Sequence, residues 1–444
     1  MKVPAHQRFT LANGIRLILI PRPGIPLIAF EAVVRGGASR IAPERAGVAS
    51  LTAELLTRGA GKRDAFAFAE AVEDVGGSFD ADAHSEAVML HGQFLAKDRE
   101  LMLELLADAV QRPRLDADEF DTLRSRRIEF IKAAKDSEPQ SLIGAYGRSM
   151  LFAQHVYGTP IGGSESTLAT IGRQDLLQFY RQQFGADRLT LVFAGDFDPQ
   201  WMHDAVSAQF ENWSCSAAAL EPLLTSNRIS GRRVLLIDAP DSSQTYFWIA
   251  NVGVARGYAQ RVALDVTNTA FGGSFGSMLV QALRVKTGLT YSASSGFRRG
   301  SVPGEFAISS FTQTESTSQA LEIALGTLGE LKRHGINEAG LDSARRYILG
   351  QYPLAFETAA DWAGALAELD LYQLPHSYIE DYGAEVSRVT AQQSRLVVES
   401  AFPEPENVDI VLIGDAQQIR AEAANFGPVT EKSLEAPDFT AAAA

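Results

Sequence analysis

An arginine and a tyrosine seven residues apart could take part in chemistry in the second half of the chain. Arg284 and Tyr291 follow the glycine-rich residues 272–276 in FGGSFGSMLVQALRVKTGLTYSASSGF. A tyrosine hydroxyl keeps its proton at neutral pH and donates hydrogen bonds well. Without further context, such residues also serve helix ends and strand packing. The glycines do not indicate a nucleotide site, because no Lys-Ser or Lys-Thr follows them, and they are typical of a turn that permits close backbone approach.

The seven histidines show no spacing typical of a metal site. The closest pair, His84 and His91, lies in a stretch expected to be a strand, where an odd spacing directs two side chains to opposite faces. The others are scattered at positions 6, 155, 203, 334 and 376. The sequence therefore predicts no metal on this chain.

A segment of the first half resembles a zinc-binding motif. GVASLTAELLTRGAGKRDAFAFAEAVEDVGGSFDADAHSE is similar to the start of the pitrilysin-type zinc peptidases, the inverzincin family that includes mitochondrial processing peptidase-like enzymes. Their inverted motif H-x-x-E-H places two histidines on one helix face with a water-activating glutamate between them. When Gly47 is aligned with the glycine before that motif, the three positions hold Ser50, Ala53 and Glu54. None is the residue required.

These substitutions leave a poor zinc site. A catalytic zinc takes three nitrogen or carboxylate ligands, whereas Ser50 offers a weak neutral hydroxyl and Ala53 offers nothing. The family's third ligand, a glutamate roughly 75 residues further on, falls near Glu129 and Phe130. Two carboxylates without a histidine hold zinc badly. We therefore interpret Glu54 and Glu129 as solvated helix carboxylates.

The segment with Arg284 and Tyr291 is similar to the same family's C-terminal signature, L-x-x-x-R-x-x-x-G-L-x-Y, with Gly288 and Leu289 also matching. The resemblance implies that Tyr291 donates a hydrogen bond to the scissile carbonyl and that Arg284 binds the substrate backbone. An oxyanion donor of this kind contributes about 3 kcal/mol to transition-state stabilisation. The implied substrate-binding residues are Arg284, Tyr291, Gly272 and Gly273.

The resemblance extends over most of the chain. HVYGTPIGGSESTLATIGRQDLLQFYRQQFGADRLTLVFAGDFD resembles the family stretch in which a YG-P-G turn precedes a helix and a closing Gly-Asp strand. We expect Tyr157, Gly158 and Pro160 to serve turn geometry.

The chain also repeats itself. RLTLVFAGDFDP around Gly195 returns as NVDIVLIGDAQQ around Gly414, at an offset of 219 residues, and the region of Val34 has a looser counterpart at Val252, at an offset of 218. Two similar offsets indicate duplicated halves of about 215 residues. We expect domains at 1–213 and 231–444, joined by a linker at 214–230 that is small, polar and Pro-containing.

Each half is expected to be an α+β domain. In the first half, residues 16–22, 27–34 and 78–94 have strand character, and 46–59 and 65–77 have helical spacing. Residues 116–135 open with Asp116 and Glu119, a capping-box-like helix start. We expect a mostly antiparallel sheet with helices on one face in each half, which is the pitrilysin/LuxS-like metallopeptidase fold that the resemblance implies.

Composition excludes several classes of function. A net charge of −14 opposes nucleic-acid binding, and no run of apolar residues is long enough for a membrane span. The single cysteine, Cys215, excludes an internal disulfide. We expect a cytoplasmic location, with a removed signal and a periplasmic location left open.

The resemblance implies division of labour between two subunits. We expect this chain to be the non-zinc subunit of a heterodimeric metallopeptidase, lending Arg284 and Tyr291 to a zinc-bearing H-x-x-E-H partner that hydrolyses peptides or unfolded segments. No activity is expected of the chain alone, and no cofactor on it. The alternatives are a structural subunit of the core-protein kind and a homodimeric peptide-binding chamber without hydrolysis.

Overall fold

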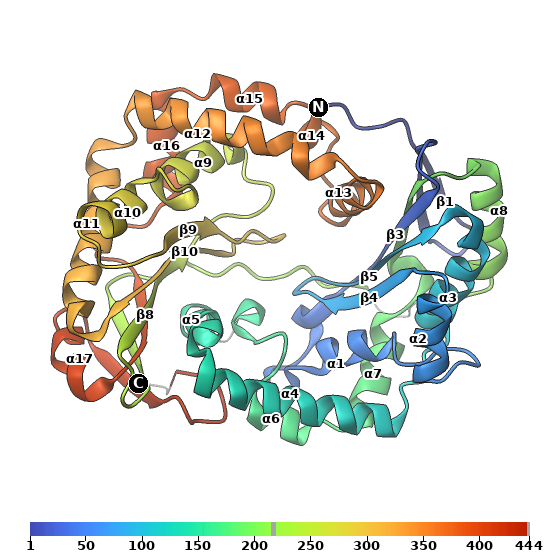
Figure 1. Ribbon diagram of the computed structural model, residues 1–444, viewed down its shortest axis with the longest axis horizontal. Helices are drawn as coiled ribbons and strands as arrows, with labels where there is room; N and C mark the ends of the chain where they lie inside the picture. The colour runs from blue at the N-terminus through green and yellow to red at the C-terminus, as the bar shows by residue number, and fades with distance from the viewer. Residues whose placement is uncertain (154, 215–218, 442–444) are drawn as a thin grey trace.

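The computed structural model describes residues 1–153, 155–214 and 219–441, so Cys215 lies outside the described residues. Within them, the strands form two six-stranded sheets at opposite sides of the molecule (Figure 1). The first sheet has the order β1-β2-β6-β3-β5-β4 and the second has the order β12-β7-β11-β8-β10-β9. Residues 219–230, between the two sheets in sequence, contain no helix or strand. The exact domain boundaries at 213 and 231 stay a prediction.

Most neighbouring strands in both sheets are antiparallel. The parallel pairs are β2 with β6 in the first sheet and β7 with both β11 and β12 in the second. This arrangement confirms the expected α+β class with mostly antiparallel sheets. The strands are β1 (Gln7–Thr10), β2 (Arg16–Pro21), β3 (Leu27–Arg35), β4 (Ser78–Ala83), β5 (Ala87–Leu95), β6 (Leu189–Gly195), β7 (Arg233–Asp238), β8 (Gln244–Val252), β9 (Ala293–Phe297), β10 (Glu305–Gln313), β11 (Asp409–Gly414) and β12 (Val429–Ser433).

The strand pairing confirms the duplication and corrects one of its offsets. Gly195 ends β6 and Gly414 ends β11, as the offset of 219 predicts. In the first sheet Glu31 pairs with Val192, and in the second Trp248 pairs with the equivalent residue, Val411. Glu31 and Trp248 are therefore equivalent, at an offset of 217 rather than 218. The difference matters because a shift of one residue reverses the face on which a side chain lies.

Helices of each half cover one face of their own sheet. In the first half, apolar side chains of β3 and β6 such as Phe30 and Phe193 are buried in one cluster with α1, α3 and α8. The first-half helices are α1 (Val48–Leu55), α2 (Ala65–Glu73), α3 (Arg99–Gln111), α4 (Ala117–Ser137), α5 (Ile143–Phe152), α6 (Glu165–Thr170), α7 (Arg173–Gln183) and α8 (Pro199–Phe210). The second-half helices are α9 (Arg261–Asn268), α10 (Met278–Val280), α11 (Thr317–His334), α12 (Glu338–Gln351), α13 (Ala359–Leu371), α14 (Ser377–Glu380), α15 (Tyr382–Arg388), α16 (Ala391–Ala401) and α17 (Ala416–Ala423).

One sequence expectation about helix starts is wrong. The Asp116 side chain does not cap α4. Its carboxylate instead accepts a hydrogen bond from Arg114 Nε at 2.6 Å. A nearby guanidinium competes successfully for the carboxylate, because a charged donor binds it more strongly than a backbone amide does.

Two helices are exchanged between the halves. Helix α13, from the second half, packs on the remaining face of the first sheet, where Trp362 and Leu366 bury Val33. Helix α5, from the first half, packs in the same way on the second sheet, so closely that a Cβ at Gly147 would lie 2.5 Å from the Trp248 ring. Neither half therefore completes its own core, which fixes the two sheets relative to each other.

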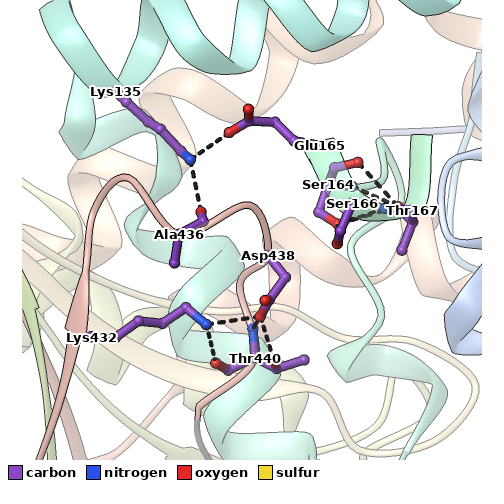
Figure 2. Close-up of polar contacts among 9 residues, drawn as sticks. All are labelled: Lys135, Ser164, Glu165, Ser166, Thr167, Lys432, Ala436, Asp438 and Thr440. Atoms are coloured by element: carbon purple, nitrogen blue, oxygen red, sulfur yellow. Dashed lines mark hydrogen bonds and ion pairs between the residues drawn. The ribbon is translucent and has the colours of Figure 1, made fainter. Parts of the chain in front are cut away.

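The C-terminal strap, residues 434–441, adds a third connection (Figure 2). It leaves β12 and returns to the first half, where Ser166 N donates to Pro437 O at 2.9 Å and the Phe439 ring packs edge-on against Tyr146. The buried Lys135 on α4 donates to the Glu165 carboxylate and, at 2.7 Å, to Ala436 O. A lysine buried in this way is stabilised only while both acceptors stay in place.

Among the described residues, no helix is long and apolar enough to cross a membrane.

Candidate functional site

The segment that resembles the zinc motif lies on α1, in the first half of the chain. Gly47 precedes the helix with φ 105°, a backbone conformation that favours glycine. Ala53 is fully buried in the core, and Ser50 is half-buried. A buried methyl group and a lone hydroxyl offer no ligand set, so the helix now serves packing at two of the three motif positions.

Glu54, at the third position, is engaged by an arginine. Arg127 on α4 donates from Nη2 to Glu54 Oε2 at 2.7 Å, and Arg58 lies 3.8 Å from the other carboxylate oxygen. The interpretation of Glu54 as a solvated carboxylate is therefore wrong: it is about one-third exposed and holds α1 to α4 through an ion pair.

The interpretation of Glu129 as a solvated helix carboxylate is confirmed. Glu129 lies on the outer face of α4, where it is exposed and pairs with Lys132 at 2.9 Å. Arg127 faces α1 because it shares the inward side of α4 with Leu123 and Ile131, at helical spacing. A guanidinium that faces Glu54 repels a metal cation, so the residues at this end do not fit zinc. Among the described residues, no three His, Cys, Asp or Glu side chains are placed to hold a metal ion.

Arg284 and Tyr291 lie at the second-domain end, on the segment that leads into β9. Arg284 is in the π-helical turn η8 (Gln281–Lys286), and Tyr291 stands two residues before the strand. The Tyr291 side chain is 81% exposed and has no hydrogen-bond partner among the described residues. Arg284 lies 4.8 Å over the ring of Phe275, itself 66% exposed, and has no carboxylate partner there either. Both polar groups are available to bind another molecule.

The glycines before this segment hold it against the sheet. Gly272 ends up so close to β9 that a Cβ would lie 2.3 Å from Ser295 Oγ, which confirms the expected close backbone approach. Asn268 and Ser295 exchange two hydrogen bonds beside it, at 3.0 and 2.8 Å. Gly273 is exposed in the same π-helical turn, η7 (Thr269–Gly273). Gly272 therefore positions β9, and substrate binding by Gly272 and Gly273 stays a prediction.

The two ends do not touch each other. Among the described residues, no hydrogen bond or ion pair joins Ser50 or Glu54 to Arg284 or Tyr291. The first pair lies on α1 and the second pair follows α10, and Figure 1 shows these helices on opposite sides of the molecule. The chain by itself therefore does not assemble the two halves of the expected chemistry around one point.

The histidine pair was placed incorrectly from the sequence. Residues 78–94 form a hairpin of β4 and β5 rather than one strand, and His91 lies opposite Asp80. Because His84 follows Asp80 by four residues, it continues the same face as His91. Desolvation lowers the pKa of His84, and Arg298 and His91 add to that lowering.

Sequence reasoning missed a cavity between the domains, of about 560 Å³. Tyr157, expected to serve turn geometry, contributes to its wall and donates its hydroxyl to Glu86. Burial raises the pKa of Tyr157 above its ordinary value, so the hydroxyl stays a donor. Glu31 on β3 also lines the cavity, and its signal was visible as a single carboxylate inside the apolar strand LIAFEAVV.

Comparison with known proteins gives the chain its family. Residues 28–163 match the model described as insulinase (peptidase family M16), and residues 170–348 match that of the peptidase M16 inactive domain. An uncharacterized zinc protease of Mycobacterium bovis is 26% identical over 394 residues, 88% of this chain and 90% of that protein. A Helicobacter pylori protein described as a non-peptidase homolog is 24% identical over 339 residues, 75% of this chain and 77% of that one.

Solved structures share the fold. The crystal structure of a peptidase M16 inactive domain from Pseudomonas fluorescens superimposes with a TM-score of 0.86 at 24% identity, covering 93% of this chain and 98% of that one. A protease from Helicobacter pylori superimposes with a TM-score of 0.85 at 19% identity, covering 93% and 100%. With both halves matched by its models and the fold shared throughout, the chain belongs to the M16 peptidase family.

Proposed function

We propose that this chain is the non-zinc subunit of a heterodimeric metallopeptidase, which supplies Arg284 and Tyr291 to a zinc-bearing partner subunit. Zinc on the partner would activate the water that attacks the peptide. Tyr291 donates a hydrogen bond to the carbonyl oxygen as it becomes negative, and Arg284 binds the substrate backbone beside it.

The observation that carries this proposal is that the polar groups of Tyr291 and Arg284 have no acceptor among the described residues. Tyr291 is 81% exposed, and the half-buried Arg284 lies over the ring of Phe275, so both can donate hydrogen bonds to a bound molecule. At the other end, the Glu54–Arg127 ion pair has taken over the positions where zinc chemistry would begin. A chain that has the two donors but no zinc ligands requires a second chain for hydrolysis.

The substrates we propose are peptides or unfolded segments, bound largely through their backbone. The donors at Tyr291 and Arg284 address groups that every peptide bond carries, which favours broad sequence tolerance.

Reconstitution tests the proposal. The chain is expressed alone and together with an H-x-x-E-H chain encoded beside it, and zinc content and peptide cleavage are measured. We expect no zinc and no cleavage for the chain alone, and chelator-sensitive cleavage for the pair. Cleavage by this chain alone that a chelator abolishes would contradict the proposal.

A matched pair of tyrosine variants tests whether the Tyr291 hydroxyl takes part in the reaction. Tyr291→Phe in the reconstituted pair should lower kcat by roughly 10²–10³-fold, because it removes one oxyanion donor. Tyr347→Phe, at another exposed tyrosine on α12, should leave kcat unchanged. Equal activities of the two variants would remove Tyr291 from the reaction.

A second candidate is a catalytically inactive structural or peptide-binding homologue, including a homodimeric chamber. The family model for the second half is described as an inactive domain, and one relative is described as a non-peptidase homolog, which favours this reading. It predicts peptide binding without cleavage in every pairing with an H-x-x-E-H chain.

A further inference from the structure

The cavity between the domains joins elements that lie far apart in sequence. One wall is the first sheet, with Glu31 and Met89, and the opposite wall is the turn between β9 and β10, with Arg298 and Gly300. Helix α13 closes a third side with Glu368. Figure 1 shows the tips of β9 and β10 reaching toward β4 and β5, below α13.

A groove connects this cavity to the segment of Tyr291. The groove, of about 340 Å³, runs over the face of β9 and β10 that carries Ser294 and Gly296, which pair with Ser309 and Ala307. The cavity and the groove share Phe297, Arg298 and Glu305. The groove begins at Ser294, three residues after Tyr291, and strand geometry puts Arg298 roughly 13 Å beyond Ser294. A peptide at Tyr291 can therefore reach the cavity along one strand.

Most charged groups of the cavity wall are already paired. Arg256 pairs with Glu368, and Arg299 lies 3.0 Å from Asp265. Glu305 faces Arg148 at 3.5 Å. Glu86 accepts hydrogen bonds from Tyr157 and from Ser301 N. These groups hold the wall together and leave little charge to a ligand.

Two further charged groups of the wall, Arg298 and Glu31, have no ion pair among the described residues. Arg298 donates a hydrogen bond to Ser85 Oγ at 3.2 Å, whereas Glu31 has neither a hydrogen bond nor an ion pair. His91 lies opposite Glu31 on β5, with Asp80 beyond it on β4. Burial and the nearby Asp82 raise the pKa of Glu31 to about 8. A largely buried carboxylate without a donor is costly, and the cost is removed when a cation arrives.

We propose that the cavity binds an alkylammonium group of the peptide substrate at Glu31, with the rest of the peptide lying in the groove that leads to Tyr291. The group is a peptide's amino terminus or a lysine side chain, which share this chemistry. The direction of the peptide rests on the proposed function, whereas the ammonium site itself does not. The second sheet carries the buried Trp248 at the position equivalent to Glu31, so the site belongs to the first domain.

The test measures binding to the full chain, without a partner and without cleavage. The probe is a dye-labelled Gly/Ser/Ala peptide of roughly ten residues, long enough for the groove and cavity, with one lysine. It is also made with an acetylated amino terminus, with norleucine for lysine, and with both changes. Fluorescence anisotropy gives the affinity of each peptide for wild type, for Glu31→Gln and for the control Glu44→Gln, at an exposed carboxylate of the first half.

We expect Glu31→Gln to weaken binding of the unmodified peptide at least roughly tenfold and to leave the doubly modified peptide unaffected. Loss on acetylation alone identifies the amino terminus, and loss on norleucine substitution alone identifies the lysine. Equal affinities for wild type and Glu31→Gln, equal losses in both glutamine variants, or no binding of the unmodified peptide to wild type would each overturn the proposal. Failure of the proposed function shows separately, as an unchanged kcat of Tyr291→Phe in the reconstituted pair.

Discussion

The side chains on α1 and the side chains before β9 differ in whether they have partners within the protein. At the first-domain end, Ala53 is buried in the core and Glu54 is tied to Arg127 by an ion pair. At the second-domain end, Tyr291 is exposed and Arg284 is half-buried, and neither has an acceptor among the described residues. The side chains at the first end are therefore engaged in internal contacts, whereas the donors at the second end can bind another molecule.

The largest expected effect concerns the contacts that hold the two ends at fixed positions. Lys135→Met removes the donor to Glu165 and to Ala436 of the C-terminal strap, and leaves a largely buried carboxylate without its partner. We expect the free energy of unfolding to fall by about 3 kcal/mol, measured by urea denaturation. Lys132→Met, three residues away on the same helix, removes an exposed ion pair and should leave the free energy of unfolding almost unchanged. Similar losses in both variants would show that the strap does not join the halves.

The second prediction tests the role of Arg284 in substrate binding. Arg284→Gln in the reconstituted pair should lower kcat/KM by roughly tenfold to a hundredfold, mainly through a higher KM, because a neutral amide binds the substrate backbone more weakly than a guanidinium. Lys286→Gln, an exposed cation of the same turn, should change neither constant. Steady-state kinetics of both variants with one peptide measures these changes. An unchanged KM in Arg284→Gln would contradict the role of Arg284 in binding the substrate backbone.

The third prediction concerns variants that restore the zinc motif on α1. Ser50→His, Ala53→Glu and Glu54→His together restore H-x-x-E-H, but Arg127 still faces the helix and should keep zinc affinity low. Adding Arg127→Glu supplies a carboxylate in its place and should strengthen zinc binding by roughly tenfold or more, measured by calorimetry. Equal affinities with and without the change at position 127 would mean that Arg127 does not occupy the third ligand's place.

The smallest effect concerns the pH dependence of stability. The pKa of Glu31 is raised to about 8, so between the ordinary glutamate pKa and about 8 the folded chain holds a proton that the unfolded chain has released. Stability from this group therefore falls as pH rises through that window. Glu31→Gln should melt above wild type at pH 9 and match it near pH 5, because glutamine has no charge to desolvate at high pH. A variant that melts below wild type at pH 9 would contradict this account.

Local patterns predicted the family, the duplication and the strands, because apolar periodicity and the Gly-Asp strand ends are properties of short segments. They failed where a contact depends on the fold. Arg127 meets Glu54 only because α1 and α4 cross, and the exchange of α5 and α13 depends on how the two halves associate. No spacing rule connects residues of different elements.

Two failures were local. The turn at Ser85 and Glu86 inside residues 78–94 was overlooked, which put His84 and His91 on opposite faces. The carboxylate of Glu31, in an otherwise apolar strand, was a readable signal of a polar cavity. The C-terminal strap could not be recognised, because its sequence carries no helical or strand period.

The most direct measurement of the central claim is a titration of the purified zinc-bearing H-x-x-E-H subunit with this chain, followed by peptide cleavage. We expect almost no cleavage at the start, a linear rise on addition of this chain, and saturation at a one-to-one ratio. We also expect the Tyr291→Phe chain to saturate at the same ratio with little activity. Full activity of the zinc subunit alone, unchanged by this chain, would contradict the proposed role of Tyr291 and Arg284.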